Sequence, residues 1–253
     1  MKKLAFVCAA VCALLLCGCS ENRDHSPELN AAIENRAAQK TLGGECMLEI
    51  AAAESAAPVY YLRGQFACDK QEKTAFMEFD QTWLGMSSKA YNYFSDGEVI
   101  NVTDGERFVQ PREAEEILAK FPYFAPEPRR DTDGAVSRAE AAKGYTYSYT
   151  RKNDAAFCES VVGGDLYELV AVMKQPQTDK TVYGDVLFTC TADGDKLLSY
   201  GFEFEVTLFD TPAYVPGYSV PESEYTLKLR VTARITYGDG EITVKREEKS
   251  SAY

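Results

Sequence analysis

Residues 91–110 read YNYFSDGEVINVTDGERFVQ, in which two Asp-Gly pairs separate runs of alternating apolar and polar residues. An Asp-Gly pair favours a type I′ turn, because both central residues need a positive φ, and the twist of that turn suits antiparallel strands. A turn at residues 96–97 would place Tyr93 opposite Ile100, and the second turn would place Ile100 opposite Val109. The stretch therefore predicts a three-stranded meander, one face of which carries Tyr91, Tyr93, Ile100, Val102 and Val109.

The last third of the chain repeats this pattern, with strands predicted at 182–191, 196–209 and 225–237. Phe202, Phe204, Val206 and Leu208 would share one face of the second strand. A closing hairpin is predicted to turn at residues 239–240. Strands with one apolar face need a cover. The amphipathic stretches 27–41, 111–121 and 153–174 are predicted to be helices that supply it. The predicted fold class is α+β, with a strongly curved antiparallel sheet, a half-barrel, wrapped around a few helices.

The N-terminal segment has the pattern of an export signal. Lys2-Lys3 precedes an apolar run that is too short to span a bilayer, and LCGC follows at 16–19. LCGC resembles a bacterial lipobox, which implies cleavage before Cys19 and attachment of a lipid to its thiol; the alternative is an ordinary signal peptide that contains cysteine. The predicted organisation is a signal peptide at 1–18, a polar tether at 19–26, one domain at 27–245 and a polar tail at 246–253.

Composition argues against several classes of function. The net charge of −12 suits neither nucleic acid nor an anionic membrane surface. The only histidine, His25, lies in the predicted tether, so hydrolase triads and most zinc sites lack a base or ligand. No pair of carboxylates is singled out for glycosidase chemistry. We therefore expect no enzyme activity, no cofactor and no metal.

Residues 129–140 resemble a calcium loop at six positions, but Arg129 occupies the first, where an acid is needed. The simpler interpretation is a turn followed by a helix with a Ser137–Glu140 capping box. The outward residues Lys228 and Arg230 belong to a basic stripe, which Glu203 and Glu205 on the neighbouring strand are expected to offset.

Four cysteines remain beyond the predicted signal peptide and Cys19, at positions 46, 68, 158 and 190. A hairpin centred on residue 57 would place Cys46 opposite Cys68, so a disulfide between them is one prediction. The alternative is that all four are buried, reduced thiols that act as small apolar side chains.

Two apolar clusters are candidates for ligand contact. Trp83, Leu84 and Met86 surround a turn, where they either line the mouth of a cavity or cap the core. The loop at 211–223 is long for a connector and carries Tyr214 and Tyr218 between prolines, which suits a lid or a contact surface.

The lipobox, the first helix, the meander SDGEVINVTDGERFV and the later meander ending ITYGDGEITV resemble, in their order, the LolA-like and LppX-like lipoprotein carrier fold. Surface lipoproteins of Gram-positive bacteria with that shape are the most similar. The resemblance covers residues 27–245 and carries no catalytic motif.

The resemblance implies a concave apolar cavity, and with it a protein anchored to the bacterial membrane that binds a lipid-like, apolar or amphiphilic molecule. The alternative is a surface adaptor with a filled core and a protein partner. The residues expected to line the cavity are Trp83, Leu84, Met86, Tyr91, Tyr93, Ile100, Phe202, Phe204, Tyr214 and Tyr218.

Overall fold

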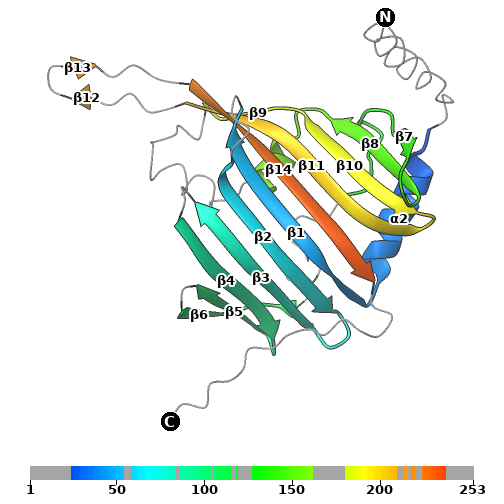
Figure 1. The fold of residues 1–253 in the computed structure, drawn as a ribbon, viewed down its shortest axis with the longest axis horizontal. Helices are drawn as coiled ribbons and strands as arrows, with labels where there is room; N and C mark the ends of the chain where they lie inside the picture. The colour runs from blue at the N-terminus through cyan, green and yellow to red at the C-terminus, as the bar shows by residue number, and fades with distance from the viewer. Residues whose placement is uncertain are drawn as a thin grey trace, which may run out of the picture.

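The protein is described by a computed structural model, shown in Figure 1. The residues that the structure describes are 24–53, 58–83, 86–103, 105–114, 118, 127–161, 180–209, 214–215, 218–219 and 224–237. The predicted signal peptide, Cys19, the second part of the predicted 153–174 helix, the turn at 239–240 and the tail lie outside them.

One 12-stranded sheet dominates the molecule, and all its strands pair antiparallel. Its order is β6-β5-β4-β3-β2-β1-β14-β11-β10-β8-β7, with β9 paired to β11. The strands that run from the first edge to the centre are β6 Glu106–Pro111, β5 Glu98–Thr103, β4 Met86–Ser95, β3 Thr74–Trp83, β2 Pro58–Asp69 and β1 Thr41–Ala52. Those that follow are β14 Glu224–Tyr237, β11 Lys196–Phe209, β10 Val186–Asp193, β9 Val182–Tyr183, β8 Tyr145–Arg151 and β7 Ser137–Glu140.

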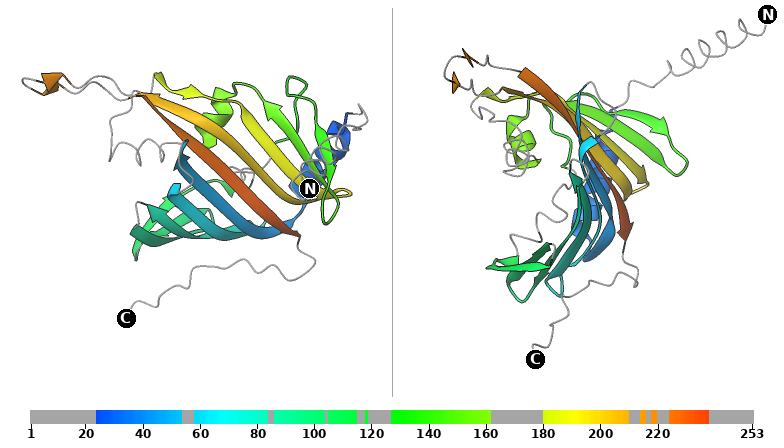
Figure 2. Two further views of the ribbon diagram at one scale, coloured as in Figure 1. Left: turned by 45° about the horizontal axis from the view of Figure 1, so that its top comes forward. Right: turned by 60° about the vertical axis from the view of Figure 1, so that its left-hand side comes forward.

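The sheet curves strongly without closing, and its hollow side holds the helices (Figure 2). Helix α2, Ser26–Ala38, packs against β10 and β11, and residues 155–161 form a second helix. A separate two-stranded ribbon, β12 Tyr214–Val215 with β13 Tyr218–Ser219, projects from the sheet. The predicted fold class, a curved antiparallel sheet wrapped around helices, is confirmed.

The first predicted meander is present in the predicted register, and the strands β10, β11 and β14 of the second pair in chain order. Tyr93 pairs with Ile100, and Ile100 pairs with Val109. Asp96 and Gly97 have φ values of 54° and 78°, as a type I′ turn requires. The hairpin between β10 and β11 does not have an Asp-Gly pair as its turn. Asp193 pairs with Lys196, so the turn consists of Gly194 and Asp195.

Several predicted boundaries were wrong. Helix α2 ends at Ala38, before the predicted end at residue 41, and Thr41 is already the first residue of β1. Pro111 ends β6 and does not begin a helix. Residues 137–140 form β7 where a capped helix was expected, because their backbone pairs with the neighbouring strand β8.

Candidate functional site

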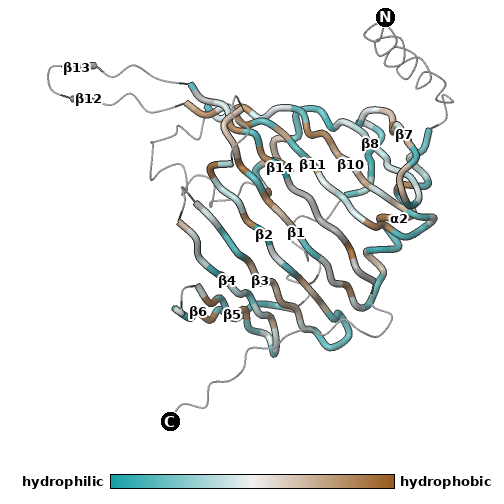
Figure 3. The backbone as a smooth tube through the Cα atoms, viewed as in Figure 1, coloured by the Kyte–Doolittle hydropathy of each residue, from teal (hydrophilic) through white to brown (hydrophobic). Residues whose placement is uncertain are grey.

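Side chains on alternate strand positions divide between two faces, and only one face meets the helices. Figure 3 shows this alternation of hydrophobic and hydrophilic residues along the strands. The main core cluster joins Leu29 and Ile33 of α2 to Phe66, Met77 and Phe204 of the sheet. Their face is therefore the concave face of the sheet. We call it the inner face and divide it into two halves that differ in burial.

The packed half is the inner face of β8, β10 and β11. Its aromatic rings contact one another directly: Tyr149 stacks on Phe188 at 4.9 Å between centroids, and Phe157 meets Phe202 edge-on at 5.1 Å. Phe188, Phe202 and Phe204 are each at most 3% exposed. This half is a filled core, in which the sheet's rings and Phe157 of the helix are in direct contact.

The helix at 155–161 is positioned by its first turn. Asp154 caps it, because its Oδ1 accepts a hydrogen bond from the backbone N–H of Phe157 at 3.0 Å and its carbonyl accepts one from Cys158 at 3.0 Å. The cap directs Phe157 onto Phe188 and Phe202. The predicted helix around 154–161 is thus confirmed within the described residues.

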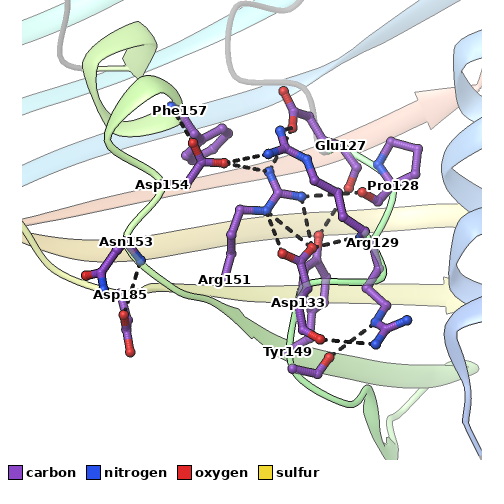
Figure 4. Close-up of polar contacts among 12 residues, drawn as sticks. Glu127, Pro128, Arg129, Asp133, Tyr149, Arg151, Asn153, Asp154, Phe157 and Asp185 are labelled. Carbon is purple, nitrogen blue, oxygen red and sulfur yellow. Dashed lines mark hydrogen bonds and ion pairs between the residues drawn. The ribbon is translucent and has the colours of Figure 1, made fainter.

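A buried ion network fixes the edge of the packed half (Figure 4). The guanidinium of Arg151, a residue only 2% exposed, donates to both carboxylate oxygens of Asp133, at 3.1 Å each through Nε and Nη2. It also donates to Glu127 at 2.7 Å and reaches Asp154 at 3.5 Å. Its centre lies 5.0 Å from the ring centroid of Phe188. One cation therefore ties together the loop before β7, the end of β8 and the second helix.

Burial by itself would lower the pKa of Arg151, but hydrogen bonds with Asp133 and Glu127 outweigh it, and the pKa is raised. The arginine is therefore charged at neutral pH. Asp133 is thereby used as its counter-ion, which leaves the calcium-loop hypothesis for 129–140 without that ligand. The described residues hold no group of three His, Cys, Asp or Glu that could bind a metal.

Sequence reasoning missed Arg151, although a signal was present. The strand YTYSYTR alternates, and Tyr147, Tyr149 and Arg151 fall on the same side. An arginine in line with two inward tyrosines must find a buried counter-charge. What the sequence could not say is which acid supplies it, because Asp133 lies 18 residues away in a loop.

The open half is the inner face of β4, β5 and β6. Its floor continues from buried Phe66, Met77 and Phe79 on β2 and β3, which are 3%, 2% and 8% exposed. Toward the edge the burial falls: Ala90 and Val99 are half-buried, and Phe108 is 56% exposed. Phe94 on β4 is still buried, at 4% exposed, so the apolar surface that this half presents lies at the edge of the sheet, around Phe108.

Two polar pairs interrupt the open half. Gln81 donates to the hydroxyl of Ser88 across β3 and β4 at 2.6 Å. Asn92 and Asn101 are direct register partners across β4 and β5, and both are half-buried. They share a row with Met77 on one side and Phe108 on the other. The open half is amphiphilic: its apolar residues are interrupted by neutral hydrogen-bonding groups, and its edge strand β6 adds one acid, Glu106.

The structure does not bring the predicted cavity residues to one face. Phe202 and Phe204 lie on the inner face, whereas Tyr91, Tyr93 and Ile100 lie on the outer face. The strand register shows this: the residues paired in turn across the sheet from Phe202 lead to Ser88 on β4, so Ser88 faces inward and Tyr91, an odd number of residues away, faces outward. The two tyrosine rings stack there at 6.3 Å. The expectation was wrong because β3 to β5 are apolar on both faces, so alternation by itself could not choose the inner one.

The remaining predicted cavity residues are spread over the molecule. Trp83 ends β3 on an inner-face row and Met86, 61% exposed, begins β4. Leu84 lies outside the described residues. Tyr214 and Tyr218 belong to the projecting ribbon of β12 and β13.

The four described cysteines are free thiols, and all are buried. Cys68 pairs with Leu42, and Cys46 pairs with Gly64, four residues from the predicted register. The predicted Cys46–Cys68 disulfide was wrong, since the two residues share a face without being neighbours. Burial raises the pKa of the Cys46 thiol to about 11 and that of Cys190 to about 12.

Two other predictions concern charged residues. His25 was assigned to the tether but is the N-cap residue of α2 and only 6% exposed. On the outer face, Glu203 accepts from Lys228 at 3.0 Å and from Arg230 at 3.1 Å, as expected for an offset basic stripe. No helix among the described residues is long and apolar enough to cross a membrane.

Comparisons with known proteins give matches of fold and not of sequence. No family model and no curated protein matches the chain. The structure is similar to that of LprF from Mycobacterium bovis, with a TM-score of 0.44 and 10% identity over 87% of this chain and 95% of the other. It is also similar to the LolA superfamily protein NE2245 from Nitrosomonas europaea, with a TM-score of 0.28 and 8% identity over 86% and 94%.

Proposed function

We propose that this protein is a non-catalytic binding protein of the bacterial cell envelope, which holds an apolar or amphiphilic, lipid-like molecule against the open half of its inner face. The observation that carries this proposal is the gradient of burial, from Phe79 at 8% to Phe108 at 56% exposed. A concave surface that presents graded apolar area gains free energy when an apolar chain covers it, at about 25 cal/mol per Å² buried.

The chemistry of the inner face suits a ligand that is bound without being chemically changed. Its positions on β1 to β5 are apolar or neutral, and the described strands place no acid, base or nucleophile cluster there. Such a surface can bind and shield a hydrocarbon chain but offers no group for proton transfer. In this proposal Cys19 carries the membrane anchor and residues 20–23 belong to the tether.

The packed half supports a second candidate function, that of an adaptor. Its rings fill the space under α2 and the 155–161 helix, so this half can act only through its outer face. An adaptor would need no ligand. The two candidates therefore differ in whether the open half takes up an apolar molecule.

The test is native mass spectrometry of residues 20–253 after envelope-targeted expression, followed by titration with an apolar fluorescent probe. We expect an added lipid mass or saturable probe uptake. Ala90→Trp should abolish uptake by filling the open half, whereas Ser87→Trp on the outer face of the same strand should not. A bare mass without uptake would instead support the adaptor.

A further inference from the structure

The sheet ends in two edge strands, which differ in what they expose. All six residues of β6 are exposed, and two of them are large and apolar: Phe108 at 56% on the inner face and Val109 at 38% on the outer face. β7, at the other end of the strand order, carries Arg138 and Glu140 and no large apolar side chain. Charged residues protect an edge from pairing, whereas exposed apolar residues favour it. Among the described strands, β6 is therefore the edge suited to accept a further strand (Figure 1).

The direction of the backbone groups along β6 follows from one hydrogen bond. The N–H of Arg112 donates to the carbonyl of Gly97 at 2.9 Å, so residues 112, 110, 108 and 106 direct their backbone groups toward β5. Because this direction alternates along an antiparallel strand, Arg107, Val109 and Pro111 direct theirs away from β5. Proline has no N–H. Within β6, both an N–H and a C=O therefore point outward only at residues 107 and 109.

A second copy of β6 matches this edge in one antiparallel register. With Phe108 of one copy opposite Phe108 of the other, Arg107 of each copy faces Val109 of the other, and these two pairs exchange four backbone hydrogen bonds. The bonds use the backbone of residue 107 and are independent of the contacts of its side chain. Glu106 then faces Gln110, so no like charges oppose one another.

The neighbouring registers are less favourable. A register centred on residue 107 would place two arginines opposite each other, which is destabilising. Registers centred on residue 109 or 110 would set Pro111 against an outward-facing residue and lose hydrogen bonds, because proline cannot donate. Of the registers centred on residues 107 to 110, only the one centred on Phe108 avoids both penalties.

We propose that two copies of this protein pair through β6 in this register and join their sheets edge to edge about a two-fold axis. Phe108 and its symmetry copy form a non-hydrogen-bonded pair, the kind in which side chains approach most closely. Each ring covers part of the other, and Val109 packs against the apolar stem of Arg107 on the outer face. The inner faces of the two open halves meet along the paired rings. The pairing goes beyond the proposed lipid binding and does not depend on it.

Disulfide trapping in residues 20–253 tests the register. The double variant Glu106→Cys/Gln110→Cys should form a disulfide-linked dimer under mild oxidation, because each introduced thiol faces the other position in the second copy. Neither single variant should do so, since like positions lie about 13 Å apart along the paired strands. The same separation prevents a disulfide within one chain. The four described native cysteines are buried, so the unsubstituted protein is the blank.

Sedimentation velocity over a range of concentrations measures the pairing without oxidation. Phe108→Asp should raise the dissociation constant of the dimer at least about tenfold, because two carboxylates would oppose one another. Leu187→Asp is the matched control: Leu187 is also apolar and 40% exposed, but it lies on β10 and its substitution should leave the constant unchanged. Circular dichroism checks that each variant is folded.

Three results would overturn the proposal. The first is a double variant that crosslinks no more than the single variants. The second is a wild-type protein that stays monomeric at every concentration, and the third is equal weakening by Phe108→Asp and Leu187→Asp. Uptake of the apolar probe is measured separately, so a failure of pairing and a failure of lipid binding are distinguishable.

Discussion

The packed and open halves of the inner face are built from the same strand pattern and end in different states. In the packed half, Phe188 and Phe202 are 1% and 3% exposed because the helix at 155–161 brings Phe157 onto them. In the open half, Phe108 occupies an equivalent inward position on β6 and is 56% exposed. Strand alternation therefore sets which side chains face inward, and helix placement sets which of them are covered.

The strongest test of this contrast removes the ion network of the packed half. Arg151→Met should destabilise the protein by about 3–5 kcal/mol, because it leaves Asp133 buried without its counter-ion. The measurement is the free energy of unfolding in urea. A loss below about 1 kcal/mol would show that the network does not hold the 127–134 loop and the second helix in place.

A matched pair of ring deletions compares the halves directly. Phe202→Ala should cost about 3–5 kcal/mol, since it leaves a cavity among packed rings. Phe108→Ala should cost less than about 1 kcal/mol, because its ring is already largely exposed. Equal losses in urea titrations of the two variants would contradict the division into halves.

Alkaline pH should weaken the packed half through its thiols. Burial raises the pKa of Cys158 and Cys190 to about 12, from 9.0 without burial. Because the folded pKa lies above the unfolded one, this contribution to stability is complete below pH 9 and is lost as the pH rises toward 12.

Urea titrations at several alkaline pH values measure the effect. Cys190→Ala should flatten the fall in unfolding free energy above pH 9, and an unchanged slope would contradict a buried, neutral thiol. Below pH 9 the folded protein should keep all four thiols unreactive to alkylation until urea is added.

The smallest effect is expected on the outer face. Arg230 is paired with Glu203 at 3.1 Å and Glu49 at 3.8 Å but is half-exposed. Arg230→Met should therefore change the unfolding free energy by less than about 1 kcal/mol. It is the control for Arg151→Met, since both remove an arginine with two or more carboxylate partners and differ mainly in burial.

Much of the fold could be read from local pattern. The Asp-Gly turn at 96–97 and the alternation around it predicted the pairing of Tyr93 with Ile100 residue by residue. Turn chemistry fixes register over a few residues, where no distant contact can override it. The longer connection between β1 and β2 has no such signature, and the predicted register there was wrong by four residues.

The candidate site was less predictable. Tyr91 and Tyr93 were assigned to the cavity because they belong to an alternating strand, yet Asn92 and Phe94 are the residues on the inner face. On a strand with apolar residues on both sides, the choice of inner face depends on what packs against it. The Asn92–Asn101 pair was overlooked for the same reason, as asparagines on a strand are ordinarily assigned to solvent.

The sequence by itself determined the class of this protein: an antiparallel sheet with tight Asp-Gly turns, amphipathic helices and a single histidine, His25. These properties follow from backbone sterics and side-chain periodicity, which act between near neighbours in the chain. Only the tertiary structure decided that Arg151 is neutralised by Asp133, that β4 turns Asn92 inward, and that one half of the inner face is filled while the other presents Phe108. Those outcomes depend on contacts between residues far apart in sequence, whose geometry exists only once the sheet has formed around the helices.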